Sequence, residues 1–515
     1  MKMMPVHTII VGAGSAGGAL AARLSEDPDQ RVTLLEAGPD YATLDELPAD
    51  IRDADAVSTS AHDWGIKAYF IEPPHAREPQ VYGRGRVVGG CSSVNACIAH
   101  RATTDDGARW AAAGLDEWSW DKILPYYKKL ETDQDFGAGD AHGGSGPVPI
   151  KRITRDEWPP ATVAMEKAAA NLGFPLLEDF NVPGADGFAA SARNVRDGST
   201  RAGTLVSYLL EARQRPNLTI LSETYCLRVL FEGAKAVGVE IDRGNGPERL
   251  DADRVVLSAG FVQSPQLLTL SGVGPAATLD ELGIAPVVVN DQVGRNLKDH
   301  PIVPVIGLIP QTDHHGLRAE LKYTTQRGRE MGVVDDAYMF SVTMEPESLG
   351  FEVGADAEPF TLLSILVKPT STGWLRVVSN DIRDQPEIHS NFLGSDDDMT
   401  RMMQEVRLAY RFATTEPMAS EIQSVIVPAA EVVDDDAALR EWLRETLATG
   451  FHGTSTCRMG NDPTESVVSQ RLAVHGTENL YVADCSVLYD ITSAATNLTG
   501  IMIGERMADW LSGRA

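Results

Sequence analysis

The chain has 515 residues, of which 43% are hydrophobic and 23% are charged, so it is long enough for two or more domains with a large core. Its net charge of −28, from 45 basic and 73 acidic residues, argues against binding to nucleic acids and to anionic membrane surfaces. No apolar run is long enough to span a bilayer, and the first apolar segment begins too early for a secretory signal to precede it. We therefore expect a cytoplasmic protein without a membrane span. The five cysteines are scattered and show no metal-ligand spacing, so we expect free thiols and no metal site.

The first forty residues have the pattern of a strand, a tight turn, a helix and a second strand. Apolar runs at 8–11 and 32–35 predict two buried strands, and the run of small helix formers at 16–24 predicts the helix between them. The second strand leads directly into Glu36, where a carboxylate that binds ribose is expected. This order predicts a unit that binds a dinucleotide.

Three glycines in the turn of this unit have the spacing G-x-G-x-x-G. Gly12 permits the tight turn, Gly14 lets the backbone approach a pyrophosphate, and Gly17 lets the helix lie close to the first strand. The helix N-terminus then offers free N–H groups to the phosphates. The carboxylate of Glu36 disfavours the 2′-phosphate of NADP, but the pattern does not distinguish FAD from NAD.

The segment 82–101, YGRGRVVGGCSSVNACIAHR, predicts a backbone-rich anion nest that leads into a helix. Arg84 and Arg86 within it could neutralise phosphate, although a plain glycine-rich turn explains this segment alone equally well. Further along, the polar segment 137–148 predicts a loop, in which we expect His142 to be exposed to solvent rather than catalytic.

The rest of the chain alternates between patterns typical of strands and patterns typical of helices. Short apolar runs after Pro216 predict a meander of strands, and a helix is expected to start near Ser264 and Pro265, since serine and proline are favoured at helix starts. Residues 302–400 contain alternating apolar runs that are typical of an antiparallel sheet, and a last helix is expected near Asn497. Without a repeat or a low-complexity linker, the domains are expected to be interleaved.

Taken together, several of these segments resemble the glucose–methanol–choline (GMC) family of FAD-dependent oxidoreductases. The sequences GRVVGGCSSVN (85–95) and GFVQSPQLLTLSGVG (260–274) are similar to its two signatures, and further matches lie at 293–300, at 451–460 and around Asn497. The resemblance covers nearly the whole chain, and the nearest subgroups are bacterial choline oxidases and hydroxymethylfurfural-type alcohol oxidases.

The resemblance implies an α/β fold in which a Rossmann-like FAD-binding domain (1–155, 201–300 and 446–515) is interleaved with an α+β substrate domain on an antiparallel sheet (156–200 and 301–445). It also implies FAD contacts at the pyrophosphate turn, the ribose, the adenine, the flavin and the late strand end. The residues are Gly12, Gly14, Ser15, Ala16, Glu36, Ala37, Cys226, Gly85, Val88, Gly89, Asn95, Ala96, Asp484, Cys485, Asn497 and Thr499. Choline oxidases have a flavin-linked histidine where this chain has Val94, so FAD is expected to be noncovalent here.

The same resemblance implies that His452 and Asn497 are the catalytic pair. An imidazole can accept the hydroxyl proton of an alcohol, while an amide can orient that hydroxyl without changing its own charge. FAD would take the hydride, and oxygen would reoxidise it to give hydrogen peroxide. A dehydrogenase that passes electrons to a quinone or a carrier, and a hydroxynitrile lyase, remain as alternatives. The implied substrate is a primary alcohol, with aromatic and furanic alcohols as candidates, and no acidic residue matches the one that holds the cation of choline.

Overall fold

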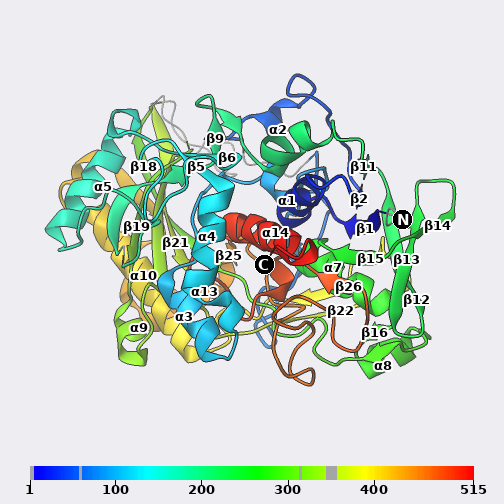
Figure 1. Ribbon diagram of the computed structural model, residues 1–515. Coiled ribbons are helices and arrows are strands. Elements are labelled where there is room, and N and C mark those ends of the chain that lie inside the picture. The colour runs from blue at the N-terminus through cyan, green and yellow to red at the C-terminus, as the bar shows by residue number, and fades with distance from the viewer. Residues whose placement is uncertain (1–4, 57–60, 185, 313–315, 344–355, 515) are drawn as a thin grey trace.

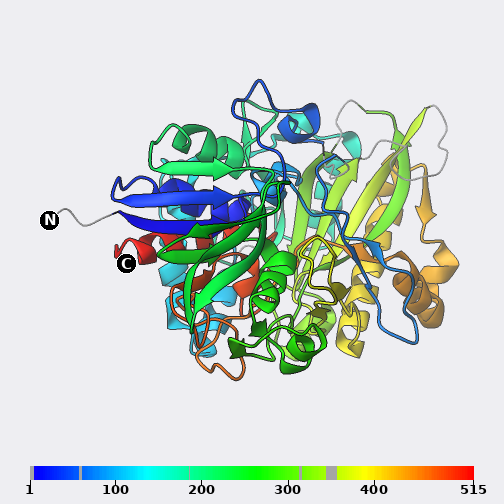
Figure 2. The same cartoon turned by 90° about the vertical axis from the view of Figure 1, so that its right-hand side faces the viewer.

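The structure is a computed structural model that describes residues 5–56, 61–184, 186–312, 316–343 and 356–514. Two sheets dominate it, a parallel one that contains the N-terminal strand and a larger antiparallel one at the other end of the molecule (Figures 1 and 2). The described part of the chain begins and ends beside the parallel sheet (Figure 2).

The parallel sheet has the strand order β11-β2-β1-β15-β26, and every neighbouring pair in it is parallel. Its middle strands are almost completely buried apolar runs, as expected for a sheet that is covered on both faces. The bounds are β1 Val6–Val11, β2 Gln30–Leu35, β11 Leu218–Leu221, β15 Arg254–Leu257 and β26 Leu480–Val482. These strands come from three separate stretches of the chain.

Helices α1 (Ser15–Leu24) and α14 (Asn497–Leu511) pack against each other beside this sheet, and α14 lies in the middle of the molecule (Figure 1). Small residues permit the close approach: a Cβ atom at Gly504 would lie 2.2 Å from the carbonyl oxygen of Ala16. The last helix thus holds the N-terminal dinucleotide unit in place.

The antiparallel sheet has the order β24-β18-β21-β20-β19-β7, with β25 also paired to β18. Helices α5 (Pro160–Asn171) and α10 (Asp396–Thr414) cover its outer face (Figure 1), and its inner face is turned toward the rest of the molecule. The bounds are β7 Gly187–Ala190, β18 Pro301–Pro310, β19 Gly316–Tyr323, β20 Ala337–Thr343, β21 Ala357–Leu366, β24 Ser424–Val427 and β25 Ala448–Thr449.

Segments that contribute to the two large sheets alternate along the chain. The domain boundaries at 155, 200, 300 and 445 stay a prediction. A separate three-stranded meander contains β12 Tyr225–Glu232, β13 Lys235–Asp242 and β14 Pro247–Asp251.

The remaining elements are short strands and connecting helices. The strands are β3 Lys67–Ala68, β4 Gln80–Val81, β5 Glu131–Asp133, β6 Val148–Arg152, β8 Ala192–Arg193, β9 Val195–Arg196, β10 Thr200–Arg201, β16 Val273–Gly274, β17 Val288–Val289, β22 Trp374–Arg376 and β23 Glu387–His389. The helices are α2 Ala49–Arg52, α3 Thr104–Ala112, α4 Trp120–Leu130, α5 Pro160–Asn171, α6 Leu210–Ala212, α7 Gly260–Leu270, α8 Ala276–Glu281, α9 Gln326–Met331, α10 Asp396–Thr414, α11 Met418–Glu421, α12 Ala430–Asp434 and α13 Asp436–Thr446. Within the described residues, no helix is both long enough and apolar enough to cross a membrane.

Two local predictions were wrong. The glycine-rich segment leads into a single 3₁₀ turn at Gly90–Ser93 and then into irregular chain, not into a helix. Helix α7 begins at Gly260, so Pro265 lies inside it. Proline cannot donate to the carbonyl one turn earlier, which is that of Phe261, and the Thr456 hydroxyl donates to this oxygen instead at 2.6 Å. A partner distant in sequence therefore makes the internal proline tolerable.

Candidate active site

A single cavity of about 1270 Å³ runs from the turn after β1 to the inner face of the antiparallel sheet. Ligand pockets usually measure about 300–1,000 Å³, so this one is large enough for a dinucleotide together with a small substrate. Both sheets contribute to its wall, and so do the segments 83–100 and 450–453 between them.

The turn after β1 forms one end of the cavity and has the geometry that the glycine pattern predicts. Gly12 has a φ of +101°, and a Cβ atom at Gly17 would lie 1.9 Å from the Gly12 carbonyl oxygen. A Cβ atom at Gly14 would meet no atom within 4 Å, so the backbone there borders open space in the cavity wall. This cradle fits a pyrophosphate at the N-terminus of α1.

Glu36 lies beside this turn, with its side chain buried. Its two carboxylate oxygens accept hydrogen bonds from the backbone N–H groups of Ala13 at 3.1 Å and Gly38 at 2.9 Å. Burial nevertheless raises the pKa of Glu36 to about 7. Because each carboxylate oxygen can accept more than one bond, the group fits the two hydroxyls of a ribose.

Asn497, the first residue of α14, lines the cavity and contacts the phosphate turn. Its Oδ1 accepts a hydrogen bond from the Ser15 hydroxyl at 2.9 Å. Its Nδ2 is buried and has no hydrogen-bond partner in the part of the chain that the structure describes. A buried donor of this kind fits an acceptor atom of a bound ligand.

Asp484 fixes the start of α7 at the wall of the cavity. Its Oδ2 accepts hydrogen bonds from the Gly260 backbone N–H at 2.9 Å and from the Ser264 hydroxyl at 2.6 Å. The carboxylate is therefore largely engaged within the protein, and Asp484 connects the end of β26 to the helix.

His452 lies in the middle part of the cavity wall, and its nearest polar partner is another histidine. The Nδ1 atoms of His452 and His300 are 2.9 Å apart, and the two rings meet edge to face at 76°. Asp299, the neighbour of His300, holds the segments that contain His300 and His452 together. Its Oδ1 accepts hydrogen bonds from the backbone N–H groups of His300 at 2.7 Å and His452 at 2.8 Å. The hydroxyls of Tyr82 and Thr449 donate to its other oxygen.

The hydrogen-bond network assigns the proton positions on both rings. His300 Nε2 lies 3.0 Å from the carbonyl oxygen of Thr492, which can only accept, so His300 Nε2 carries a hydrogen. Burial lowers the pKa of His300 to about 4, so the ring is neutral and its Nδ1 has a free lone pair. His452 Nδ1 must then donate to it, and His452 Nε2 is left as the acceptor.

Burial also disfavours a charge on His452. Desolvation holds its pKa well below the ordinary value, and the neighbouring His300 and the cation of Arg84 act in the same direction. His452 is thus a neutral base whose free nitrogen is defined by the surrounding bonds.

Most of the predicted site residues come together at this cavity. Its wall includes Gly12, Gly14, Ser15, Ala16, Glu36, Ala37, Gly85, Asn95, Ala96, Cys226, His452, Asp484, Cys485 and Asn497. Val88, Gly89 and Thr499 are not part of the wall. The backbone N–H of Gly89 donates to the Ala13 carbonyl behind the turn, and the Thr499 hydroxyl pairs with that of Tyr127 at 2.7 Å. No hydrogen bond joins Asn497 to His452 among the described residues.

The two arginines of the glycine-rich segment have different positions. Arg84 lines the cavity and donates to the Phe451 carbonyl at 2.6 Å. Arg86 lies over the rings of Trp64 and Tyr225 and is not part of the wall. Sequence reasoning missed His300 and also His100, which lines the other end of the cavity. The only signal for His300 was its place at the end of a matched motif, VGRNLKDH.

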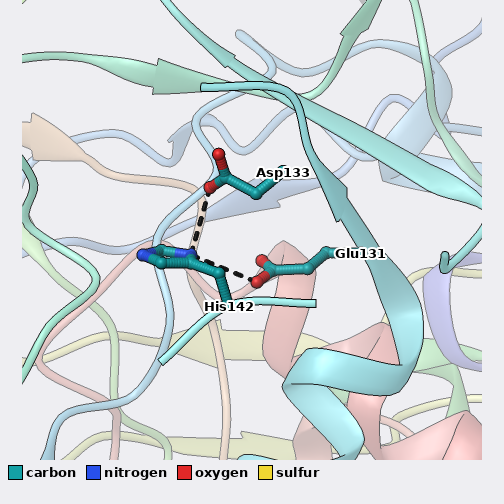
Figure 3. A group of neighbouring side chains, drawn as sticks. All are labelled: Glu131, Asp133 and His142. Carbon is teal, nitrogen blue, oxygen red and sulfur yellow. Dashed lines mark hydrogen bonds and ion pairs between the residues drawn. The ribbon is translucent and has the colours of Figure 1, made fainter. Parts of the chain in front are cut away.

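His142 is buried, so the prediction that it is exposed to solvent was wrong. Its Nδ1 lies 3.1 Å from a carboxylate oxygen of Asp133 and 3.3 Å from one of Glu131 (Figure 3), and its Nε2 lies 3.2 Å from Asp179. Burial and the nearby cation of Arg101 oppose a charge on His142, but its interactions with these three carboxylates outweigh both and raise its pKa to about 10.

Glu131, Asp133 and His142 are close enough together to hold a metal ion. Guanidinium groups already lie against two of them, however: Arg152 Nη1 is 2.9 Å from Asp133, and Arg101 Nη1 is 3.7 Å from Glu131. Within the described residues the cluster therefore has its own cations, and it is an ion-pair network rather than a metal site.

Comparisons with known proteins agree with this site. Two family models, both described as GMC oxidoreductase, match residues 6–302 and 369–504. The chain is 33% identical to 5-(hydroxymethyl)furfural oxidase of Methylovorus sp. (strain MP688), with 97% of each chain covered. It is 34% identical to oxygen-dependent choline dehydrogenase of Pseudomonas savastanoi pv. phaseolicola, over 98% of this chain and 93% of the relative. The structure resembles that of pyridoxine 4-oxidase from Mesorbium loti with a TM-score of 0.89 at 28% identity, with 99% of each chain covered.

The chain belongs to the GMC oxidoreductase family. It is therefore an FAD-dependent oxidoreductase that acts on CH–OH groups, and the fold is the one that the sequence resemblance implied.

Proposed function

We propose that this protein oxidises a primary alcohol to the aldehyde, with His452 Nε2 as the base that accepts the hydroxyl proton. The observation that carries the proposal is the 2.9 Å contact between His452 and His300, since it leaves a single bare nitrogen of a neutral imidazole on the cavity wall. The overall reaction converts the alcohol and molecular oxygen into the aldehyde and hydrogen peroxide.

FAD, when bound, supplies the acceptor for the hydride that leaves the alcohol carbon. The turn at Gly12 and Gly14 would hold its pyrophosphate and Glu36 its ribose. The fit is supported by the open space at Gly14 and by the orphan donor on Asn497. Val94 lines the cavity with a hydrocarbon side chain, which cannot form a bond to the flavin, so we propose that FAD is noncovalent.

Asn497 is the proposed positioning group for the alcohol. Its amide can donate to the hydroxyl oxygen while His452 accepts the hydroxyl proton. The proton then lies on the ring of His452, where the resulting cation balances negative charge that develops nearby.

The decisive experiment is anaerobic mixing of the purified yellow protein with a panel of primary alcohols. We expect loss of the oxidised flavin absorbance, followed by its recovery and the appearance of peroxide when air is admitted. Acid precipitation should leave the flavin in the supernatant, and flavin in the pellet would contradict noncovalent binding.

Two further outcomes exclude the proposal, the first in this experiment and the second in a parallel assay with a cyanohydrin. Reduction by alcohols without recovery in air would mean that a quinone or a carrier is the acceptor. Release of cyanide from a cyanohydrin with no change in flavin absorbance would indicate a lyase.

A further inference from the structure

The end of the cavity that lies on the antiparallel sheet, here called the chamber, is lined largely by apolar side chains. Neighbouring strands place their side chains there in rows: Ile302, Ile365 and Tyr338 form one row across β18, β21 and β20. Pro304, Leu363 and Phe340 form the next. Residues directly opposite each other in a sheet point to the same face, so each row presents a continuous apolar strip to the cavity.

Three rings in this chamber are nearly parallel. Tyr338 and Phe340 lie two residues apart on β20, with an angle of 8° between their planes. The ring of His100 makes angles of 25° with Tyr338 and 19° with Phe340, at centroid distances of 5.6 and 6.3 Å. Parallel faces of this kind favour a flat aromatic ligand over a bulky aliphatic one.

A polar pair lies beside the aromatic rings, with His100 in the cavity wall and Glu320 behind it. His100 Nε2 lies 2.8 Å from a carboxylate oxygen of Glu320, and both side chains are buried, with 3% and 0% exposed. Glu320 is directly opposite Phe340 in the sheet, so its side chain points to the same face as the aromatic rings. The carboxylate therefore fixes the orientation of the His100 ring at the chamber wall.

The other ring nitrogen of His100 is available to a ligand. The hydrogen bonds within the described residues give Nδ1 no protein partner, while His100 is part of the cavity wall. A polar atom that faces a binding cavity can pair with a ligand, and a site that contains one discriminates against a ligand that fails to pair with it.

We propose that the His100–Glu320 pair is a second anchor of the substrate site, which binds a polar substituent on the ring of a planar aromatic or heteroaromatic alcohol. This inference rests on the proposed function. His452 engages the reacting CH₂OH group at one end of such a substrate, and the rings of Tyr338 and Phe340 pack against its plane. His100 Nδ1 then accepts a hydrogen bond from a ring hydroxyl away from the reacting carbon.

The test compares substrates that differ only in the distal group. The kcat/KM for anaerobic flavin reduction is measured with 3- and 4-hydroxybenzyl alcohol and with the methyl analogues, in the wild type and in His100→Phe. We expect the ratio of hydroxy to methyl substrate to fall by about tenfold in His100→Phe, which is the usual effect of one hydrogen bond. Taking the ratio between the two proteins cancels the electronic effect of the substituent on the reaction.

Further variants separate anchoring from folding. Glu320→Gln still accepts from Nε2–H and should retain most of the preference. The double variant His100→Phe/Glu320→Leu leaves no unpaired buried carboxylate and should show the same loss as His100→Phe alone. The matched control is His389→Phe, since His389 stacks on Trp374 at 4.1 Å, is not part of the cavity wall, and should leave the ratio unchanged.

A binding measurement distinguishes failure of the anchor from failure of the proposed function. p-Cresol cannot be oxidised by the proposed reaction, and its binding is followed by perturbation of the flavin absorbance. We expect it to bind the wild type about tenfold more tightly than His100→Phe binds it. Equal binding, equal substrate ratios in both proteins, or preferential oxidation of choline or straight-chain alcohols would overturn the anchor. Failure of every alcohol to reduce the flavin would instead overturn the proposed oxidation.

Discussion

His300 and His452 face each other through their Nδ1 atoms at 2.9 Å, although 152 residues separate them in the sequence. Two Nδ1 atoms at this distance share one hydrogen. The carbonyl oxygen of Thr492 accepts a hydrogen bond from His300 Nε2–H, so the neutral His300 ring has no hydrogen on Nδ1. The hydrogen between the two Nδ1 atoms is therefore bonded to His452. His300, rather than His452 itself, thus determines which nitrogen of His452 is left as the acceptor, and this is the nitrogen that we propose accepts the substrate proton.

The first prediction concerns His300 as a positioning residue. His300→Leu removes the acceptor for His452 Nδ1–H, so the two tautomers of His452 become mixed and flavin reduction should slow by about tenfold, the usual size of a net hydrogen bond. His300→Asn can place an amide oxygen at the same point and should recover most of the rate. The measurement is stopped-flow flavin reduction under anaerobic conditions.

The pH profile shows whether His300 has this role or a merely structural one. Because the pKa of His452 is lowered, its neutral form persists in the wild type to well below pH 6.5, and kcat/KM should fall only below that. Loss of the neighbouring imidazole should move this acidic limb to higher pH in His300→Leu. If His300→Leu binds FAD normally and shows the same rate and the same acidic limb of the pH profile as the wild type, His300 has no positioning role.

The second prediction concerns His452 and Asn497. His452→Ala should slow flavin reduction by roughly a hundredfold or more, which is the usual contribution of a positioned base. Asn497→Ala should slow it less, because orientation is lost while the proton acceptor remains. The two effects should be less than additive, since both residues act on one hydroxyl. A His452→Ala protein that reduces its flavin at the wild-type rate across pH would exclude His452 as the base.

The third prediction uses the raised pKa of Glu36. The hydroxyls of a ribose donate to the ionised carboxylate, so FAD binding should lower the pKa of Glu36 from its value of about 7 and release a proton. The affinity of the apoprotein for FAD should therefore weaken as the pH falls below about 7. Glu36→Ala should weaken it by about 1.5–3 kcal/mol at pH 8, the typical contribution of a hydrogen bond to a charged group.

Titration of FAD into the apoproteins between about pH 5.5 and 8 measures both effects. Glu36→Gln has the same shape but cannot ionise, so its affinity should be weaker and independent of pH. A wild-type affinity that does not change with pH, or a Glu36→Ala affinity equal to that of the wild type, would place the ribose elsewhere.

The contrast between Glu36 and His300 shows which parts of the site could be predicted from the sequence alone. The bounds of β1, α1 and β2 were predicted to within two residues, because this unit is local in sequence. Each glycine in it is required by a separate steric constraint of the turn. His300 was missed because long-range contacts bring it to His452, namely the pairing of β18 with β25 and the hydrogen bonds to Asp299, and no local pattern encodes them.

Long-range partners also explain the two predictions that failed most clearly. Pro265 marked a helix start in the sequence, but the Thr456 hydroxyl replaces the bond that the proline lacks. His142 lies in a polar loop, yet Asp179 and Arg101 approach it from other segments and bury it. Burial of a polar residue by distant groups leaves no trace in its own neighbourhood of the sequence.

The last prediction tests the network around His142 (Figure 3). Its pKa is raised in the folded protein to about 10, against an ordinary value of 6.5, so the folded state favours the charged imidazolium. This contribution to the free energy of unfolding is complete below about pH 6.5 and is lost as the pH rises through about 10. His142→Gln should therefore lower the free energy of unfolding at pH 6 by roughly 1–3 kcal/mol, the range for leaving buried polar groups without a partner.

Urea unfolding of the holoprotein at pH 6, 8 and 10 would measure this loss. The difference between wild type and His142→Gln should shrink steadily across the series, because the wild type loses its extra stability while the variant has none to lose. His75→Gln is the matched control, since His75 is exposed and its replacement should leave the free energy of unfolding unchanged at every pH. If His142→Gln and the wild type differ by the same amount at pH 6 and pH 10, His142 is not charged in this network, and the three carboxylates are balanced by the arginines alone.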